Sequence, residues 1–466
     1  MTQPPPINTL AELRATGYRS RSVKEEMRAN LVAGLRRGES FLPGVLGYDD
    51  TVLPQLENAI LAGQDVILLG ERGQAKSRIA RSLVGLLDEW VPEVAGAELH
   101  DDPLRPVSPY ALDLLGQRGE EAPIGWLHRT HRYGEKLATP DISIADLVGE
   151  VDPVKVAEGR YLSDELTIHY GLVPRTNRGI FTLNELPDLA ERIQVGLLNL
   201  MEERDVQIRG YKVRLQLDLF VIASANPEDY TSRGRIITPL KDRFGAQIRT
   251  HYPSTIAEEV AIVEQESTPL EAGIGLRFPQ YMKDVIAELT HQARRSPQVN
   301  QRSGVSVRLS ICNHETVAAS SVRRAVKLAE NEAVPRVSDL DAVAASTLGK
   351  IEVEALEEGR EGDILTKLVR QAVFAVYQRE LRGEAFSDLV QRFEEGLEID
   401  ASTHMGAEDF CRQFGDLKGM ARALEKLEAG ESPATTAAAL EFICEGLHLA
   451  KRLNKTPTEG GARYGR

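Results

Sequence analysis

A glycine-rich stretch directly after a short apolar run is the feature that most constrains how this chain can fold. The stretch is GERGQAKS, residues 70–77, and the run is DVILLG, residues 65–70. A phosphate-binding loop has Gly, four residues, Gly, Lys and then Ser or Thr, between a buried strand and a helix. Here Ala75 stands in place of the second Gly, and the amphipathic stretch KSRIARSLVGLLDEW (76–90) follows. This order predicts a nucleotide site, with an ordinary strand–turn–helix as the alternative.

Several positions of the loop have an expected role. Lys76 would reach the β- and γ-phosphates of a nucleotide, and Ser77 would bind Mg²⁺. Gly73 is expected to take a positive φ in the tight turn. The position of Ala75 is less demanding if it already lies in the helical region, where alanine is acceptable. The candidate nucleotide-binding residues of the loop are Gly70, Glu71, Arg72, Gly73, Gln74, Ala75, Lys76 and Ser77.

Apolar runs and amphipathic stretches alternate up to about residue 252. GIFTLNEL (179–186) and LFVIASANP (219–227) are predicted strands, and RIQVGLLNLMEER (192–204) is a predicted helix between them. The interval between the first two strands is too long for one crossover helix, so it must hold a further strand, for which YGEKLAT (133–139) is the candidate. Strands that alternate with helices predict a parallel sheet with helices on both faces.

Helical patterns dominate the rest of the chain. Gly38 follows the amphipathic stretch VKEEMRANLVAGLRR and predicts the end of an N-terminal helix. The final stretch, NKTPTEGGARYGR, is polar and glycine-rich, which is typical of disorder. The predicted parts are an N-terminal helical segment (1–40), an α/β domain (41–252), a helical domain (253–350), a C-terminal helical domain (351–452) and a disordered tail (453–466).

Polar residues follow the two later strands at the point where each strand ends. Phosphate-loop enzymes use an Asp–Glu pair here, the Asp for the Mg²⁺ shell and the Glu to activate water. In this chain the pair is Asn184–Glu185, so Glu185 is the candidate base. Asn184 can hold a metal-bound water but brings no charge, which predicts weaker Mg²⁺ affinity. Asn226 would place an amide near the γ-phosphate or the attacking water. The alternatives are a surface Asn–Glu turn and an Asn–Pro turn.

Two arginines are candidates for contacts with the γ-phosphate. Arg243, in PLKDRFGAQI, would act from a neighbouring subunit, with an ion pair to Asp242 as the alternative. Arg308, in GVSVRLSI, lies at the predicted start of a helix and would reach the phosphate from the helical region. Competing residues are Arg233, Arg235 and Arg249 for the first role, and Arg302, Arg323 and Arg324 for the second.

Composition excludes several classes of function. The 466 residues carry a formal net charge of −14, which argues against broad nucleic-acid binding because that needs a basic face. The three cysteines lie far apart and form neither a disulfide framework nor a metal-ligand spacing. The N-terminus has no apolar core of the signal-peptide type, and no apolar stretch approaches the ~20 residues of a membrane helix. A cytoplasmic protein without a membrane segment is expected.

This order of features resembles the AAA+ ATPases, and within them the ATPase (I) subunit of magnesium chelatase and its MoxR-type relatives. The resemblance covers about residues 41–350. It is carried by FLPGVLGYDDTVLPQLENAILAG (41–63), GERGQAKS, LATPDISIADLVGEVDPVKVAEGRY (137–161), GLVPRTNRGIFTLNELPDL, LLNLMEERDVQIRG, ASANPED and LKDRFG. The MoxR branch often has Ala-Lys where other members have Gly-Lys.

The resemblance implies a P-loop AAA+ parallel sheet flanked by helices, followed by an all-helical lid; the C-terminal helical region is additional. It implies ATP and Mg²⁺ as cofactors, with Ser77 and Asn184 at the metal. By the same resemblance Glu185 is the hydrolytic base, Asn226 the first sensor, Arg243 the finger acting in trans and Arg308 the second sensor. The segments around 107–132 and 155–175 would be the inserts of the family. A homo-hexameric ring that acts on a von Willebrand A-type or chelatase-type partner is expected.

Three departures from the family pattern keep other functions open. Asn184 replaces Asp, Ala75 replaces the chelatase-type Gly, and the region after residue 351 has no counterpart. The leading hypothesis is a Mg²⁺-dependent ATPase ring that remodels a partner or drives metal insertion. The second is an ATP-binding scaffold ring that does not hydrolyse ATP. The third is a DNA-acting AAA+ protein, which the acidic charge and the lack of a helix-turn-helix signature oppose.

Overall fold

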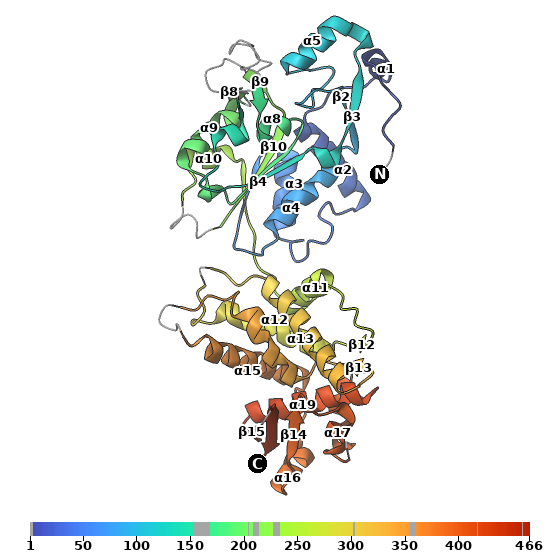
Figure 1. The fold of residues 1–466 in the computed structure, drawn as a ribbon, viewed down its shortest axis with the longest axis vertical. Coiled ribbons are helices and arrows are strands. Elements are labelled where there is room, and N and C mark those ends of the chain that lie inside the picture. Colours follow the sequence, from blue (N-terminus) through green and yellow to red (C-terminus); the bar gives the residue numbers. More distant parts are fainter. Residues whose placement is uncertain are drawn as a thin grey trace. The chain divides into compact units, whose positions relative to one another are not determined.

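The chain folds as two compact units, Met1–His251 and Tyr252–Arg466. The structure is a computed structural model, drawn in Figure 1, and it describes residues 3–151, 168–203, 205–207, 214–226, 234–301, 303–354, 359–416, 418–458 and 460–466. The division between the units lies one residue before the predicted end of the α/β domain.

A five-stranded parallel sheet forms the centre of the first unit. Its strands lie in the order β11–β1–β10–β7–β4, and every neighbouring pair is parallel. The strands are β1 (Val66–Leu69), β4 (Tyr133–Leu137), β7 (Gly179–Asn184), β10 (Leu219–Ala225) and β11 (Ala246–Arg249). The predicted parallel sheet is therefore confirmed, and the strand predicted at 133–139 is β4, which lies at one edge of the sheet. The sequence did not predict β11, the strand at the opposite edge.

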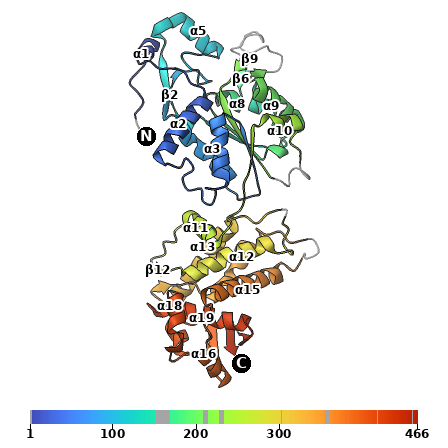
Figure 2. The same cartoon turned by 180° about the vertical axis from the view of Figure 1, so that it is seen from behind.

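Successive residues of the strands face two separate cores. Val66 and Leu68 belong to one core, whereas Ile67 belongs to the other, because side chains alternate between the faces of a sheet. The first core is completed by α2 (Val23–Arg37), α3 (Val52–Ala62) and α4 (Lys76–Ser82). The second is completed by α6 (Ile144–Leu147), α8 (Leu172–Arg175), α9 (Glu191–Glu203) and α10 (Thr238–Arg243). Figure 2 shows α2, α3, α8, α9 and α10 around the sheet in the view from behind.

The N-terminal residues are part of the first unit. Helix α2 ends at Gly38, which has φ 70°, so the predicted helix end is confirmed. A buried ion pair fixes this helix to the segment before β4, since both guanidinium nitrogens Nη1 and Nη2 of Arg132 lie 2.7 Å from the carboxylate of Glu26. The remaining elements of the unit are α1 (Leu10–Ala15), β2 (Trp90–Val94), α5 (Pro109–Arg118), β3 (Ile124–His128), β5 (Gly149–Val151), β6 (Ile168–Tyr170), β8 (Asp205–Gln207) and β9 (Arg214–Gln216).

The helix expected over residues 76–90 is shorter than predicted. Helix α4 ends at Ser82, a 3₁₀ turn follows at Leu83–Leu86, and Leu87 is already extended with φ −85° and ψ 147°. Gly85 interrupts the apolar run, and glycine in a helix costs about 1 kcal/mol relative to alanine. Trp90 then begins β2, which pairs with β3 in antiparallel orientation.

The second unit is mainly helical. Its helices are α11 (Ile256–Glu266), α12 (Gln280–Arg295), α13 (Arg308–Lys327), α14 (Val343–Thr347), α15 (Glu361–Glu380), α16 (Ser387–Glu394), α17 (Ala407–Arg412), α18 (Ala421–Lys426) and α19 (Pro433–Leu449). Two short strands, β12 (Gly275–Leu276) and β13 (Glu332–Ala333), pair in parallel. Among the described residues of both units, no helix has the length and apolar character that crossing a membrane requires.

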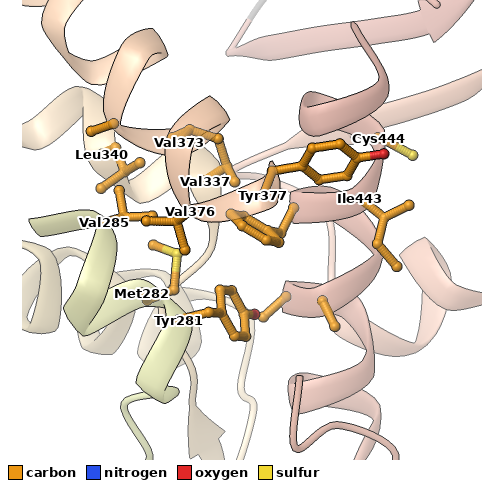
Figure 3. Close-up of a cluster of buried hydrophobic side chains, with 14 of the residues drawn as sticks. Tyr281, Met282, Val285, Val337, Leu340, Val373, Val376, Tyr377, Ile443 and Cys444 are labelled. Atoms are coloured by element: carbon orange, nitrogen blue, oxygen red, sulfur yellow. The ribbon is translucent and has the colours of Figure 1, made fainter. Parts of the chain in front are cut away.

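One hydrophobic core joins the ranges that the sequence assigned to a lid and to a separate C-terminal domain. Met282 of α12, Val376 of α15 and Ile443 of α19 belong to the same buried cluster. Figure 3 shows this cluster, with Tyr281, Tyr377 and the helices that carry them. The predicted boundary between residues 350 and 351 therefore does not separate two cores.

The prediction of a disordered tail was wrong. Strands β15 (Asn454–Thr458) and β16 (Gly461–Gly465) form an antiparallel sheet with β14 (Ile399–Ser402), in the order β14–β16–β15. Tyr464 of β16 is 1% exposed and belongs to the main core of the unit. Glycine has a steric purpose here, because a Cβ at Gly461 would lie 2.0 Å from the carbonyl oxygen of Ala401. The glycine-rich composition thus permits close strand pairing.

Candidate nucleotide-binding site

The glycine-rich loop connects β1 to α4, as predicted. Gly73 has φ 76°, which confirms the positive φ expected in the turn. Ala75 does not lie in the right-handed helical region, so the condition under which alanine would be acceptable is not met. It has φ 56° and ψ 14°, which is left-handed. An L-residue there costs roughly 1–2 kcal/mol because its Cβ crowds the following carbonyl. The usual Gly at this position is therefore a conformational requirement, and the alanine is strained.

The start of the loop packs too closely for any side chain at Gly70. A Cβ there would lie 1.9 Å from Oγ1 of Thr250 and 2.2 Å from Oε1 of Gln74. These two groups are themselves hydrogen-bonded, with Oγ1 of Thr250 donating to Oε1 of Gln74 over 2.7 Å. Thr250 directly follows β11. The strand that the sequence did not predict therefore ends in a residue that fixes the loop.

A tyrosine hydroxyl fixes the loop from another side. The hydroxyl oxygen of Tyr48 lies 2.9 Å from the carbonyl oxygen of Gln74 and 2.9 Å from that of His251. Burial raises the pKa of Tyr48 to about 12, so the hydroxyl stays protonated and acts as a donor at neutral pH. The loop backbone is thereby held in place by groups outside its own sequence.

Lys76 directs its ammonium group back into the loop. Its Nζ donates to the carbonyl oxygen of Glu71 over 2.8 Å and also to that of Gly70. The side chain is 7% exposed, although lysine is seldom buried unless it has partners. Ser77 follows as the second residue of α4 and is half-buried. Lys76 thus brings a buried positive charge to the part of the loop where a phosphate-binding loop places the β- and γ-phosphates.

The loop lies beside the ends of two other strands. Leu69 of β1 is opposite Ala225 of β10, and the amide of Gly70 donates to the carbonyl oxygen of Ala225 over 3.1 Å. Ala223 of β10 is in turn opposite Leu183 of β7. Because all three strands are parallel, their carboxyl ends share one edge of the sheet. The glycine-rich loop, Asn226 and the pair Asn184–Glu185 therefore follow neighbouring strands, as the sequence predicted.

Glu185 is held in a strained backbone conformation at this edge. Its φ of 54° and ψ of 47° are left-handed, which is uncommon outside glycine, asparagine and aspartate. Its amide N–H donates to Oγ of Ser224 over 3.3 Å. Strained residues of this kind cluster at functional sites, where surrounding contacts fix the conformation. Here Ser224, on β10, supplies such a contact.

Both asparagines of the site are buried. Asn226 is 5% exposed, and its Oδ1 has no hydrogen-bond partner among the described residues. A buried acceptor without a partner can accept a hydrogen bond from a water molecule that enters with a ligand. Asn184 is 9% exposed; its Nδ2 donates to Oε1 of Glu135 over 2.6 Å, and its Oδ1 accepts from Ser224 over 3.2 Å. Asn184 is thus linked to two polar side chains of neighbouring strands.

The candidate arginines lie on different elements. Arg243 ends α10 and pairs with Asp242, with 3.3 Å between Nη1 and Oδ2, so the ion pair considered as the alternative is present. Arg308 is the exposed first residue of α13 in the second unit, and the predicted helix start is confirmed. Arg324 is buried against Asp339, so it has a structural role. The competing Arg233 and Arg302 lie outside the described residues.

Sequence analysis missed four residues of this site. They are Tyr48 and Thr250, which fix the loop, and Glu135 and Ser224, which contact Asn184 and Glu185. Tyr48 lies in the segment that resembles the family, and Glu135 lies in the strand predicted at 133–139. These residues meet the site only through the pairing of strands that are far apart in the sequence. The one sequence feature that could have indicated Glu135 and Ser224 is a polar residue inside an otherwise apolar strand.

The residues present fit a nucleotide with Mg²⁺. The loop offers a lysine and a serine in the order that such ligands require, and the orphaned Oδ1 of Asn226 lies after the neighbouring strand. Within the described ranges, no three His, Cys, Asp or Glu side chains gather as a metal site.

Several known proteins are similar to this chain in sequence. The chain is 28% identical to magnesium-chelatase subunit ChlI of Nostoc sp. over 247 residues, which cover 51% of this chain and 62% of that protein. It is 28% identical to the ChlI of Chlorella vulgaris over 290 residues, which cover 58% of this chain and 74% of that protein. Over about half of its length the chain is therefore similar in sequence to the I subunit of magnesium chelatase. It spans 62% and 57% of the lengths of the Nostoc and Anabaena variabilis relatives.

Further comparisons are weaker. The uncharacterized protein YeaC of Bacillus subtilis is 24% identical over 262 residues, covering 52% of this chain and 76% of that protein. No family model matches the chain. Among solved structures, a chain of the complex between BchI and BchD of magnesium chelatase has a TM-score of 0.36 at 19% identity, covering 70% of this chain and 98% of that one. RuvB of Thermotoga maritima has a TM-score of 0.33 at 12% identity, covering 96% and 95%.

Proposed function

We propose that this chain is a Mg²⁺-dependent ATPase of the magnesium-chelatase I or MoxR type. The observation that carries the proposal is the meeting of three polar segments at one edge of the sheet. Lys76 follows β1, Asn226 follows β10, and Asn184–Glu185 end β7, on three strands that are direct neighbours. Phosphoryl transfer depends almost entirely on positioning and charge stabilisation, and this edge supplies groups for both.

Each residue of the edge has a chemical part in the proposal. Lys76 binds the β- and γ-phosphates, and Ser77 holds Mg²⁺, which neutralises charge on the phosphates when bound. Glu185 accepts a proton from the attacking water, and Asn226 orients that water through its buried amide. The backbone of Glu185 is already fixed by Ser224, so its carboxylate needs little reorganisation before reaction.

We further propose that the chain works in a hexameric ring on a partner protein. The relatives of known name are subunits of magnesium chelatase, which supports assembly with other chains. In such a ring Arg243 exchanges its contact with Asp242 for the γ-phosphate of a neighbouring subunit, and Arg308 contacts the nucleotide from the helical unit. The partner is of the chelatase type or carries a von Willebrand A domain, and the motor remodels it or drives metal insertion.

One observation favours a second candidate, a ring that binds ATP without hydrolysing it. Asn184 replaces the aspartate that gives the Mg²⁺ shell a negative charge in phosphate-loop enzymes. Loss of that charge would lower metal affinity and slow turnover. The two candidates differ in one measurable property, because the scaffold binds ATP and releases no phosphate.

Steady-state hydrolysis of Mg-ATP across a range of protein concentrations tests the proposal. We expect activity per subunit to rise cooperatively with concentration, since Arg243 would complete the site from the next subunit. Lys76→Ala should abolish ATP binding, whereas Glu185→Gln should keep binding and lose turnover. Normal turnover by the Glu185→Gln variant would refute the role of this residue. ATP binding without phosphate release at any concentration would favour the scaffold, and tight, salt-sensitive DNA binding would favour the DNA-acting alternative.

A further inference from the structure

A continuous chain of hydrogen bonds runs from α4 to Glu185. Nε of Arg81 donates to Oε2 of Glu135 over 2.8 Å, and Nη2 donates to Oε1 over 3.0 Å. Oε1 of Glu135 also accepts from Nδ2 of Asn184 over 2.6 Å. Asn184 then accepts from Ser224, and Ser224 accepts from the amide of Glu185. The proposed catalytic base is therefore linked to the helix after the phosphate loop through Glu135.

These groups share the face of the sheet that α4 covers. On β7, Ile180 belongs to the core beneath α4, whereas Phe181 and Leu183 belong to the opposite core. Side chains alternate between the two faces of a strand, and Asn184 comes four residues after Ile180. Asn184 therefore faces α4, as Ile180 does. Arg81 comes four residues after Ser77, and residues at this spacing share one side of a helix. Glu135 thus lies between Asn184 and the side of α4 that carries Ser77.

The carboxylate of Glu135 fixes the orientation of the Asn184 amide. A carboxylate only accepts hydrogen bonds, so the nitrogen of the amide must face Glu135. The oxygen of the amide must then face Ser224. The guanidinium of Arg81 donates to both oxygens of Glu135, which is the geometry of an ion pair with a charged carboxylate. Glu135 therefore carries its negative charge at neutral pH.

We infer that Glu135 supplies the negative charge that residue 184 lacks and is the positioning residue of the Mg²⁺ site. It would act as an outer-shell group, one residue removed from the metal, and it holds Asn184 with its oxygen directed away from β4. This inference rests on the proposed function, because it assumes that Mg-ATP binds at Lys76 and Ser77. In this chain the carboxylate comes from β4, the strand next to β7, and the Asn184–Glu135 pair takes the place of a single aspartate.

A charge swap between the two residues tests the inference. The quantity measured is the ratio of the dissociation constants of a fluorescent, non-hydrolysable ATP analogue without and with Mg²⁺, with the full-length chain. Removing outer-shell partners typically lowers metal affinity 10–100-fold, so Glu135→Gln should lower this ratio about tenfold. Asn184→Asp alone places two carboxylates in contact and should lower the melting temperature without Mg²⁺. The double variant Glu135→Gln with Asn184→Asp restores one carboxylate and one amide. It should recover both the Mg²⁺ ratio of dissociation constants and the melting temperature.

A matched control separates this role from that of an ordinary ion pair. Glu98 pairs with Arg175 over 2.7 Å elsewhere in the first unit, so Glu98→Gln removes a carboxylate–arginine contact away from the loop. It should leave the Mg²⁺ ratio unchanged. If Glu135→Gln lowers the melting temperature but also leaves the ratio unchanged, Glu135 is only a structural partner of Arg81 and the inference is overturned. If the analogue binds wild type and Lys76→Ala equally, the proposed function fails first, and this inference with it.

Discussion

Replacing Ala75 by glycine should stabilise the first unit. The left-handed backbone of this residue costs an alanine roughly 1–2 kcal/mol. Glycine takes the same conformation without that cost but loses about 0.4–1 kcal/mol through the greater entropy of the unfolded chain. The difference leaves a net gain of about 1 kcal/mol. For a unit the size of Met1–His251, this corresponds to an increase of about 2–4 °C in the melting temperature.

Thermal unfolding followed by circular dichroism checks this expectation, with two alanine-to-glycine controls. Ala329 also has a left-handed backbone, with φ 54°, but it lies in the second unit, so Ala329→Gly should stabilise that unit by a similar amount. Ala29 is exposed inside α2, where Ala29→Gly should instead cost about 1 kcal/mol. A fall in melting temperature for Ala75→Gly like that of Ala29→Gly would refute the assignment of strain to the loop.

Two further predictions concern the second unit. Deleting residues 454–466 should lower its unfolding temperature markedly and increase its proteolysis, because β15, β16 and the buried Tyr464 are lost; unchanged unfolding would show that the tail does not support the core. Burial opposes ionisation of Glu259, but His291 and Arg294 outweigh it and lower its pKa, so its contribution to stability is present at neutral pH and lost as the pH falls below about 4.5. Urea unfolding across this pH range should show a steeper loss in wild type than in Glu259→Gln, and parallel curves would contradict it.

The sequence predicted the central strands because their apolar runs are nearly continuous. Strands β1, β7 and β10 are buried on both faces, and glycine or polar residues mark where each ends. Strand β11 has the sequence AQIR, and only Ile248 in it is buried. A short edge strand needs apolar residues on one face only, so its sequence contains too few of them for the strand to be recognised. The same reasoning explains the tail, where Ala462 and Tyr464 alone carry the buried face of β16.

The candidate site could be predicted only in part. Lys76, Glu185 and Asn226 belong to short motifs next to recognisable strands, so their positions follow from local sequence. The contacts of Tyr48 and Glu135 depend on strand order and on side chains far apart in the chain, which no local pattern contains. The conformation of Ala75 could not be predicted, because a helix boundary in a sequence is uncertain by a residue or two. Here one residue separates the left-handed backbone of Ala75 from the first residue of α4.

The hydroxyl of Tyr48 connects two distant segments of the first unit. It has one hydrogen atom, yet two carbonyl oxygens lie at the same 2.9 Å distance, that of Gln74 in the loop and that of His251, the last residue before the second unit. The two acceptors therefore share a single proton. One side chain thus serves two segments that lie far apart in the sequence, the glycine-rich loop and the residue two positions after β11. A phenylalanine at position 48 would remove both contacts at once.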